Sequence, residues 1–234
     1  MQSSQKRPVV IISCPVFKSL IEERLSKNRS VRVIFLDYGL HQVPKCLNET
    51  LQNEIDQIEE PSNIILGYGL CGNGLNGIRS GIHTLIAARA DDCITILLGS
   101  YDEYRRIFDN NPGTYFLTKG WLESGNDPLR EYQVLLEKYD EPTAQWIIDQ
   151  QYKHYKKLVL VAHSQEDLEK YRPRALEVAN FCKRWSFTYE EILGSDRYIN
   201  NLLKAIEVVP KPDEDFIVVP PGGQIKQNEY FRQR

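Results

Sequence analysis

Short apolar runs alternate with amphipathic stretches through the first half of the chain. Residues 8–14 (PVVIISC) form a continuous apolar run, and residues 16–27 (VFKSLIEERLSK) follow with apolar side chains at helical spacing. Continuous runs rich in branched side chains are typical of strands buried on both faces of a parallel sheet. By the same pattern we expect further strands at 31–39, 62–71 and 83–90, and helices at 47–58, from 73–81 onward, and at 91–108.

The second half of the chain restarts this alternation after a different middle segment. Residues 110–125 are rich in turn-forming and aromatic residues, and residues 127–157 form a polar, helical stretch that breaks near Pro142. Strands are then expected at 157–163, 187–194 and 215–225, with helices at 165–185 and 195–207.

Each half thus runs through strand, helix, strand, helix, strand and glycine turn. Alternating strands and helices predict parallel sheets, so the expected fold is α/β. It has two Rossmann-like lobes with parallel sheets, pseudo-duplicated and facing a central cleft. The expected boundaries are an N-terminal lobe at 1–120, a helical bridge at 121–156, and a C-terminal lobe with its tail at 157–234.

Composition narrows the possible partners and the location. The 234 residues are 41% hydrophobic and 26% charged, with a formal net charge of −3, which argues against a nucleic-acid or anionic membrane partner. No apolar stretch approaches the roughly 18 residues of a membrane span. We interpret the short apolar run after the N-terminus as a first strand and not a signal peptide, so we expect a cytoplasmic protein. The mildly basic C-terminus (QIKQNEYFRQR) is expected to be a solvated tail.

Several chemically useful side chains fall where predicted strands end. In open parallel sheets, ligands bind beyond the carboxyl ends of the strands, and Cys14, Cys71, Arg89 and His163 all lie at such ends. Cys93 follows shortly after another strand. Zinc sites usually show close C-x-x-C pairs, which this chain lacks, so Cys14, Cys71 and Cys93 either converge in the fold or are small buried core residues. Cys46 and Cys182 lie in helix-like segments, where a packing or surface role is expected.

The stretch GYGLCGNG at 67–74 surrounds Cys71 with glycines. Its first three glycines match G-x-G-x-x-G after a strand, but a lone match of this type is weak. Glycines also allow a metal, a cluster or a flat ligand to approach the backbone closely. Cys71 is in addition a candidate nucleophile, because Arg89 or a helix start could lower its pKa. The second half offers His163 and no matching cysteine, which argues against a two-thiol racemase.

Three motifs together resemble a known family. GYGLCGNG, ARADDCITILLGSYDEY (88–104) and PGTYFLTKGW (112–121) resemble the domain-of-unknown-function family 1638 (DUF1638) of bacteria and archaea, over roughly residues 8 to 222. Family members often carry a histidine where this chain has Asp91. The resemblance implies no established activity, but members often occur in organisms with corrinoid-dependent methyl transfer. The family pattern maps onto Cys71, Cys93, Gly99, Ser100, Thr114, Tyr115, Gly120 and Trp121.

The leading hypothesis is a protein that binds zinc or an iron–sulfur cluster through Cys14, Cys71 and Cys93, and that is a candidate thiol- or methyl-transfer enzyme. His163 would act as a fourth ligand or general base, Arg89 would balance thiolate charge, and Tyr115 would orient a substrate. The residues expected to contact a cofactor are Gly69, Gly72, Asn73, Gly74 and Ser100.

Two alternatives stay open at this point. One is a non-metal binding module for a corrinoid or another tetrapyrrole-like cofactor, and the other is a metal-free cysteine enzyme. The expected partner is a small molecule or cofactor, with a corrinoid protein or a second copy of the chain as candidate protein partners.

Overall fold

The computed structural model describes residues 7–25 and 31–232. The polar residues that precede the first predicted strand and the end of the helix predicted at 16–27 lie outside this range. The chain divides into two compact units, one made of Met1–Ile96 with Asp196–Arg234 and the other of Leu97–Ser195. The divisions predicted from the sequence, at 1–120, 121–156 and 157–234, stay predictions.

A five-stranded sheet forms the centre of the first unit. Its strands follow the order β2 (Arg32–Phe35), β1 (Val9–Ser13), β3 (Asn63–Gly67), β4 (Thr84–Ala88) and β8 (Phe216–Val219). The first four are parallel, as expected, and β8 runs antiparallel to β4. The parallel strands therefore place their carboxyl ends at one edge of the sheet.

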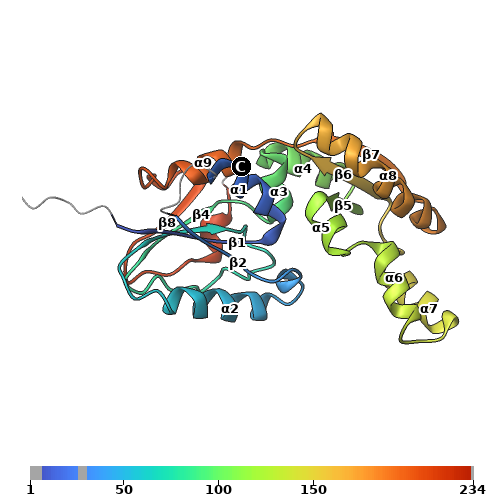
Figure 1. Cartoon of the computed structure of the whole chain (residues 1–234), viewed down its shortest axis with the longest axis horizontal. Coiled ribbons are helices and arrows are strands. Elements are labelled where there is room, and N and C mark those ends of the chain that lie inside the picture. The colour runs from blue at the N-terminus through green and yellow to red at the C-terminus, as the bar shows by residue number, and fades with distance from the viewer. Residues whose placement is uncertain (1–6, 26–30, 233–234) are drawn as a thin grey trace, which may run out of the picture. The chain divides into compact units, whose positions relative to one another are not determined.

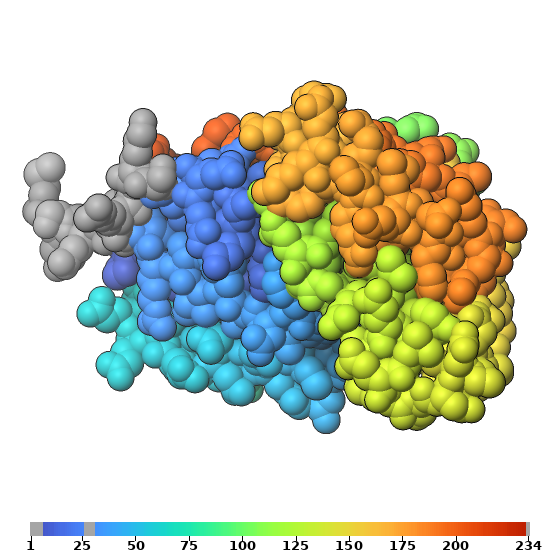
Figure 2. Space-filling view, turned by 45° about the vertical axis from the view of Figure 1, so that its right-hand side comes forward, coloured from blue at the N-terminus to red at the C-terminus, as the bar shows by residue number. Residues whose placement is uncertain are grey.

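Helices cover both faces of this sheet (Figure 1). Helix α2 (Pro44–Asp56) lies on one face and contributes Leu47, Leu51 and Ile55, which repeat every four residues and are fully buried. On the other face lie α1 (Lys18–Leu25), which follows the short helix η1 (Pro15–Phe17), and α9 (Arg197–Lys204). The outer side of α2, light blue to cyan, forms part of the surface of the first unit in Figure 2.

The second unit has a smaller sheet. Its three parallel strands are β5 (Thr114–Thr118), β6 (Lys157–Ala162) and β7 (Thr188–Leu193). Helix α8 (Gln165–Cys182) packs against β6 and β7. The remaining helices are α4 (Tyr101–Asn110), α5 (Lys119–Ser124), α6 (Pro128–Leu136) and α7 (Glu141–Tyr152), with α3 (Cys93–Leu98) bridging the unit boundary. Much of its core is aromatic, including Tyr115, Trp121, Tyr152, Tyr155 and Trp185.

Four predictions about elements are wrong, and the first two have a local reason in the backbone. Residues 73–81 form turns and not a helix, because Asn73 and Gly77 adopt left-handed backbone angles. The helix predicted at 91–108 is two helices, because Gly99 has a φ of 71° and Ser100 caps the second one. The aromatic segment that was expected to be turn-rich contains β5.

The fourth error concerns the strand predicted to complete the second lobe. That strand is β8, and it completes the first sheet. Beyond it, the C-terminal segment is not a solvated tail, because Ile225 is fully buried and Tyr230 is 2% exposed. Both side chains belong to the apolar cluster under α2, so the chain end forms part of the first unit's core.

Candidate functional site

The three cysteines at the predicted strand ends gather at the carboxyl edge of the first sheet. Cys14 directly follows β1, and its N–H donates to the Gly67 carbonyl at the end of β3, at 3.1 Å. Further along, the Cys71 N–H donates to the Asp91 carbonyl at 2.9 Å, which places the glycine turn beside the segment that leads to Cys93. We call Cys14, Cys71 and Cys93 the thiol cluster.

The chain itself explains the glycines of the GYGLCGNG turn. A Cβ at Gly69 would lie 2.8 Å from the Asp92 backbone, and a Cβ at Gly74 would lie 2.6 Å from Leu47. Real Cβ atoms do not approach other atoms this closely, so these glycines permit packing between segments. The expected cofactor contacts of Gly69, Gly72, Asn73 and Gly74 stay predictions.

The turn that carries Cys71 has an unusual backbone. Cys71, Gly72 and Asn73 adopt φ angles of 47°, 64° and 76° in succession. Residues other than glycine seldom occupy this left-handed region, and conformations of this kind cost of order 1–3 kcal/mol and tend to cluster at functional sites. The Cys71 carbonyl accepts a hydrogen bond from Gly74 at 3.2 Å, which closes the turn.

Burial keeps the thiol cluster protonated. It raises the pKa of Cys14 to about 11, although the nearby Val16 N–H lowers that pKa in part. Burial also raises the pKa of Cys71 and Cys93, and the charges of Asp92 and Cys14 raise both further. Cys71 in turn raises the pKa of Cys93, which shows that the thiols lie close enough to affect one another.

A buried tyrosine lies among these thiols. Tyr68 is 3% exposed, and within the described part of the chain its hydroxyl has no hydrogen-bond partner. Burial raises its pKa, and the thiols of Cys14, Cys71 and Cys93 raise it further together with Asp37. The protonated hydroxyl is therefore a donor near the thiol cluster that lacks an acceptor among the described residues.

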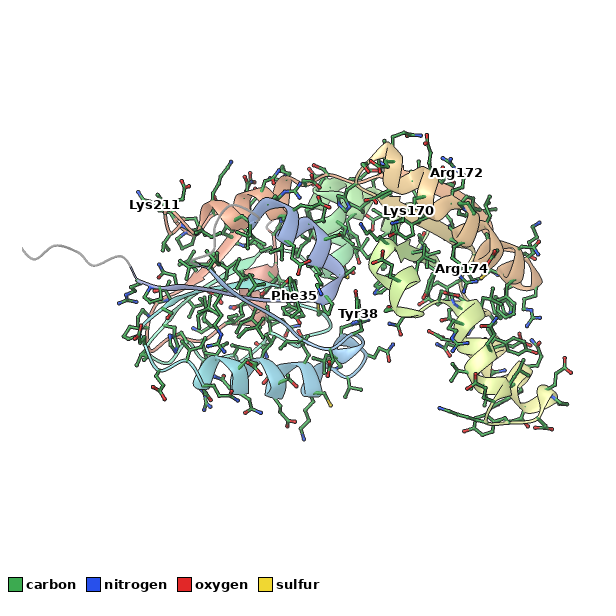
Figure 3. All side chains as sticks on the ribbon, viewed as in Figure 1. Phe35, Tyr38, Lys170, Arg172, Arg174 and Lys211 are labelled. Atoms are coloured by element: carbon green, nitrogen blue, oxygen red, sulfur yellow. The ribbon has the colours of Figure 1, made fainter. Side chains whose placement is uncertain are left out.

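Tyr68, Asp92 and His41 were not predicted as site residues. Desolvation lowers the pKa of His41 and the Asp92 carboxylate raises it, so the imidazole lies near the site. Tyr68 lies inside the GYGLCGNG motif, three residues before Cys71, and this position is the signal that could have predicted it as a site residue. The position of His41 depends on the path of the loop after β2, where Tyr38 donates to the Pro15 carbonyl at 3.3 Å (Figure 3), and no spacing rule predicts that path.

Three predicted site residues belong to the second unit. His163 bonds through Nε2 to the Leu97 carbonyl at 2.9 Å, and because a carbonyl only accepts, this nitrogen carries the proton. Tyr115 packs among Trp121, Tyr152 and Tyr155. Ser100 accepts a hydrogen bond from the Glu103 N–H and caps α4. These contacts fix structure within the unit, and the chemical roles proposed for the three residues stay predictions.

The thiol cluster is not a preformed metal site. Among the residues that the structure describes, no three His, Cys, Asp or Glu side chains are arranged so that together they could hold a metal ion. The chemistry of the donor set nevertheless suits a thiophilic metal, because thiolates are ligands of zinc and of iron–sulfur clusters. Ligation in tetrahedral geometry would require these thiols to move closer together.

Comparison with known proteins gives one match. Residues 35–203 match the model of a family described as Protein of unknown function (DUF1638). The matched residues include Cys71 and Cys93, and Cys14 precedes them. No curated protein and no solved structure matches the chain. A search of the described residues finds no helix with the length and apolar character needed to cross a membrane.

Proposed function

Because the chain belongs to the family of proteins of unknown function DUF1638, which has no assigned activity, we propose a function from its site. We propose that the thiol cluster binds a thiophilic metal centre, a zinc ion or an iron–sulfur cluster. The observation that carries this proposal is the convergence of Cys14, Cys71 and Cys93 at one edge of one sheet. Three thiolates leave one coordination position open, as in sites that act on a ligand.

Donors around the sulfurs support this proposal. The Val16 N–H faces Cys14, and the N–H groups of Gly69 and Cys93 face Cys71. Hydrogen bonds to sulfur are among the features that tune cysteine-ligated metal centres. The Tyr68 hydroxyl adds a buried donor that has no acceptor in the described part of the chain while the thiols stay neutral. Thiolates formed on metal binding would supply that acceptor.

The raised pKa values favour a metal over a free nucleophile. A cysteine enzyme without a metal needs a thiolate near neutral pH, and burial moves the pKa of all three thiols in the opposite direction. A bound cation removes this obstacle, because metal binding displaces the thiol protons. The left-handed turn at 71–73 is the segment that we expect to shift when the thiols approach one another.

The decisive experiment is metal analysis of protein purified without oxygen. Zinc and iron per chain are measured for the parent protein and for Cys14→Ser, Cys71→Ser and Cys93→Ser. Each substitution is expected to remove most of the metal, since one of three protein ligands is lost. Cys46→Ser is the matched control, because Cys46 is an exposed cysteine on α2 of the same unit.

The controls separate loss of binding from loss of folding. Circular dichroism of each variant confirms that the fold persists, and Cys46→Ser should retain the parental metal content. Equal metal content in the parent and all three cluster variants would reject the proposal. So would a parent protein that holds no metal after anaerobic purification and after reconstitution with zinc, or with iron and sulfide.

Several finer expectations stay predictions attached to this proposal. They are a thiol- or methyl-transfer reaction at the open position, a corrinoid or corrinoid-protein partner, self-association, and a duplicated pair of lobes around a cleft. A titration with cobalamin, followed by absorbance, tests the corrinoid directly. All five cysteines are free, which fits the proposed cytoplasmic location, because reducing compartments keep thiols free.

A further inference from the structure

Arg89 carries a positive charge that the described chain does not neutralise. It directly follows β4 and is half-buried, and its backbone N–H donates to the Asp215 carbonyl at 2.8 Å. Its Nε is buried and has no hydrogen-bond partner among the described residues. The carboxylate of Asp215, whose backbone Arg89 contacts, pairs instead with Arg197 and Arg232. An arginine side chain is always charged, and a buried, unpaired charge is costly. This position therefore favours an anion.

A second donor without an acceptor lies close to this guanidinium. Tyr230 is 2% exposed, and within the same described residues its hydroxyl has no hydrogen-bond partner. Burial raises the pKa of Tyr230, the charges of Cys71 and Glu229 raise it further, and the charge of Arg89 lowers it. The hydroxyl therefore lies near both Cys71 and Arg89 and remains a donor at neutral pH.

The C-terminal segment holds Tyr230 in this place. Ile225 exchanges backbone hydrogen bonds with the residues after the glycine turn, accepting from Gly77 at 2.8 Å and donating to Ile78 at 2.9 Å. Two residues beyond Tyr230, Arg232 donates to the Arg89 carbonyl at 3.2 Å. The chain end thus runs from the glycine turn to the backbone of Arg89.

We propose that Arg89 and Tyr230 form a binding subsite for a small oxyanion, a carboxylate or phosphate group, beside Cys71. A guanidinium presents a planar fork that matches two oxygens of such a group, and the tyrosine hydroxyl donates to a third lone pair. The ligand would accept hydrogen bonds from the Arg89 guanidinium and the Tyr230 hydroxyl, and it would neutralise the charge of Arg89. Because the subsite borders the thiol cluster, the anionic end of the ligand would be held next to the sulfur of Cys71.

Binding is measured on metal-free, reduced, full-length protein. This choice keeps the inference separate from the proposed metal function, so either can fail alone. Isothermal titration calorimetry measures the binding of acetate and of inorganic phosphate at constant ionic strength. The class of oxyanion that the subsite prefers is the one that saturates the protein at the lower concentration. Arg89→Gln should weaken binding about tenfold or more, the effect of losing one charge-assisted hydrogen bond. Tyr230→Phe should weaken it roughly threefold to tenfold.

The control is another arginine of the same unit. Arg32 is exposed at the start of β2, at the opposite edge of the sheet, so Arg32→Gln should leave binding unchanged. Arg89→Lys keeps the charge without the fork and should fall between the parent and Arg89→Gln, with circular dichroism confirming that each variant folds. The inference is overturned if neither anion saturates the parent protein, or if Arg89→Gln and Arg32→Gln bind equally well.

Discussion

One buried polar group of the second unit and three of the first differ in whether the chain supplies their partners. In the second unit, the fully buried Asp127 accepts hydrogen bonds from the N–H groups of Leu129 and Arg130, each at 3.0 Å, and pairs with Arg174 at 3.1 Å (Figure 3). In the first unit, the buried donors of Tyr68, Tyr230 and Arg89 have no partner among the described residues.

This difference separates structural polar groups from candidate functional ones. A buried polar group with its partners supplied by the chain stabilises and orients the fold. A buried group without a partner costs about 1–3 kcal/mol, and a bound ligand is one way to recover that cost. The unsatisfied donors of the first unit gather near the thiol cluster, so a ligand is expected at that edge of the first sheet. Substitutions in both units test this difference.

The largest effect is expected from Asp127→Ala in the second unit. The change removes the N-cap of α6 and leaves Arg174 without its buried partner, although Arg174 is 35% exposed and also pairs with Glu177. We expect the free energy of unfolding to fall by about 3 kcal/mol, less than the full cost of breaking a buried ion pair. Urea denaturation measures the change.

Asp127→Asn refines this test, because an amide oxygen can still cap the helix. It should therefore lose less stability than Asp127→Ala. Hydrogen exchange should locate the loss in α6 and α8 of the second unit, with β1 and β3 of the first unit unaffected. A loss below about 1 kcal/mol for Asp127→Ala would mean that the second unit's buried polar groups are not stabilising.

An intermediate effect is expected from pH in the first unit. Folding raises the pKa of Cys14 from 9.0 to about 11, so the folded protein binds more protons than the unfolded chain between these values. The stabilisation is complete below pH 9 and is lost as the pH rises toward 11, at up to about 1.4 kcal/mol per pH unit.

The measurement is chemical denaturation of metal-free protein at several pH values. Cys14→Ala should show a shallower loss of stability with pH, while Cys46→Ala, at the exposed cysteine, should keep the parental dependence. Identical pH dependence in the parent and Cys14→Ala would show that the Cys14 thiol is not buried as described. Bound zinc should abolish the effect, because a coordinated thiolate no longer titrates in this range.

The sequence predicted the parallel strands of the first sheet well, because β1, β3 and β4 are buried on both faces and appear as continuous apolar runs. Strand alternation also predicted that Cys14 and Cys71 end neighbouring strands. The return of β8 to the first sheet was missed, because an apolar run does not show which sheet it joins. The positions of Tyr230 and His41 near the site were missed for a related reason, since each depends on how a distant loop or chain end packs.

The smallest change in stability is expected from Tyr→Phe, made once in each unit. Because the substitution is the same, it tests directly whether partnered and unpartnered buried hydroxyls differ. In the second unit, Tyr152 donates from its hydroxyl to Glu131 at 2.6 Å, so Tyr152→Phe should lower the free energy of unfolding by about 1 kcal/mol. In the first unit, Tyr68→Phe removes a buried hydroxyl that has no partner among the described residues, and it should raise the free energy of unfolding by a similar amount in metal-free protein. Chemical denaturation measures both changes. If metal or a ligand then stabilises the parent more than Tyr68→Phe, the hydroxyl has found its acceptor; two changes of the same sign would mean that a partner, such as a bound water, already satisfies Tyr68.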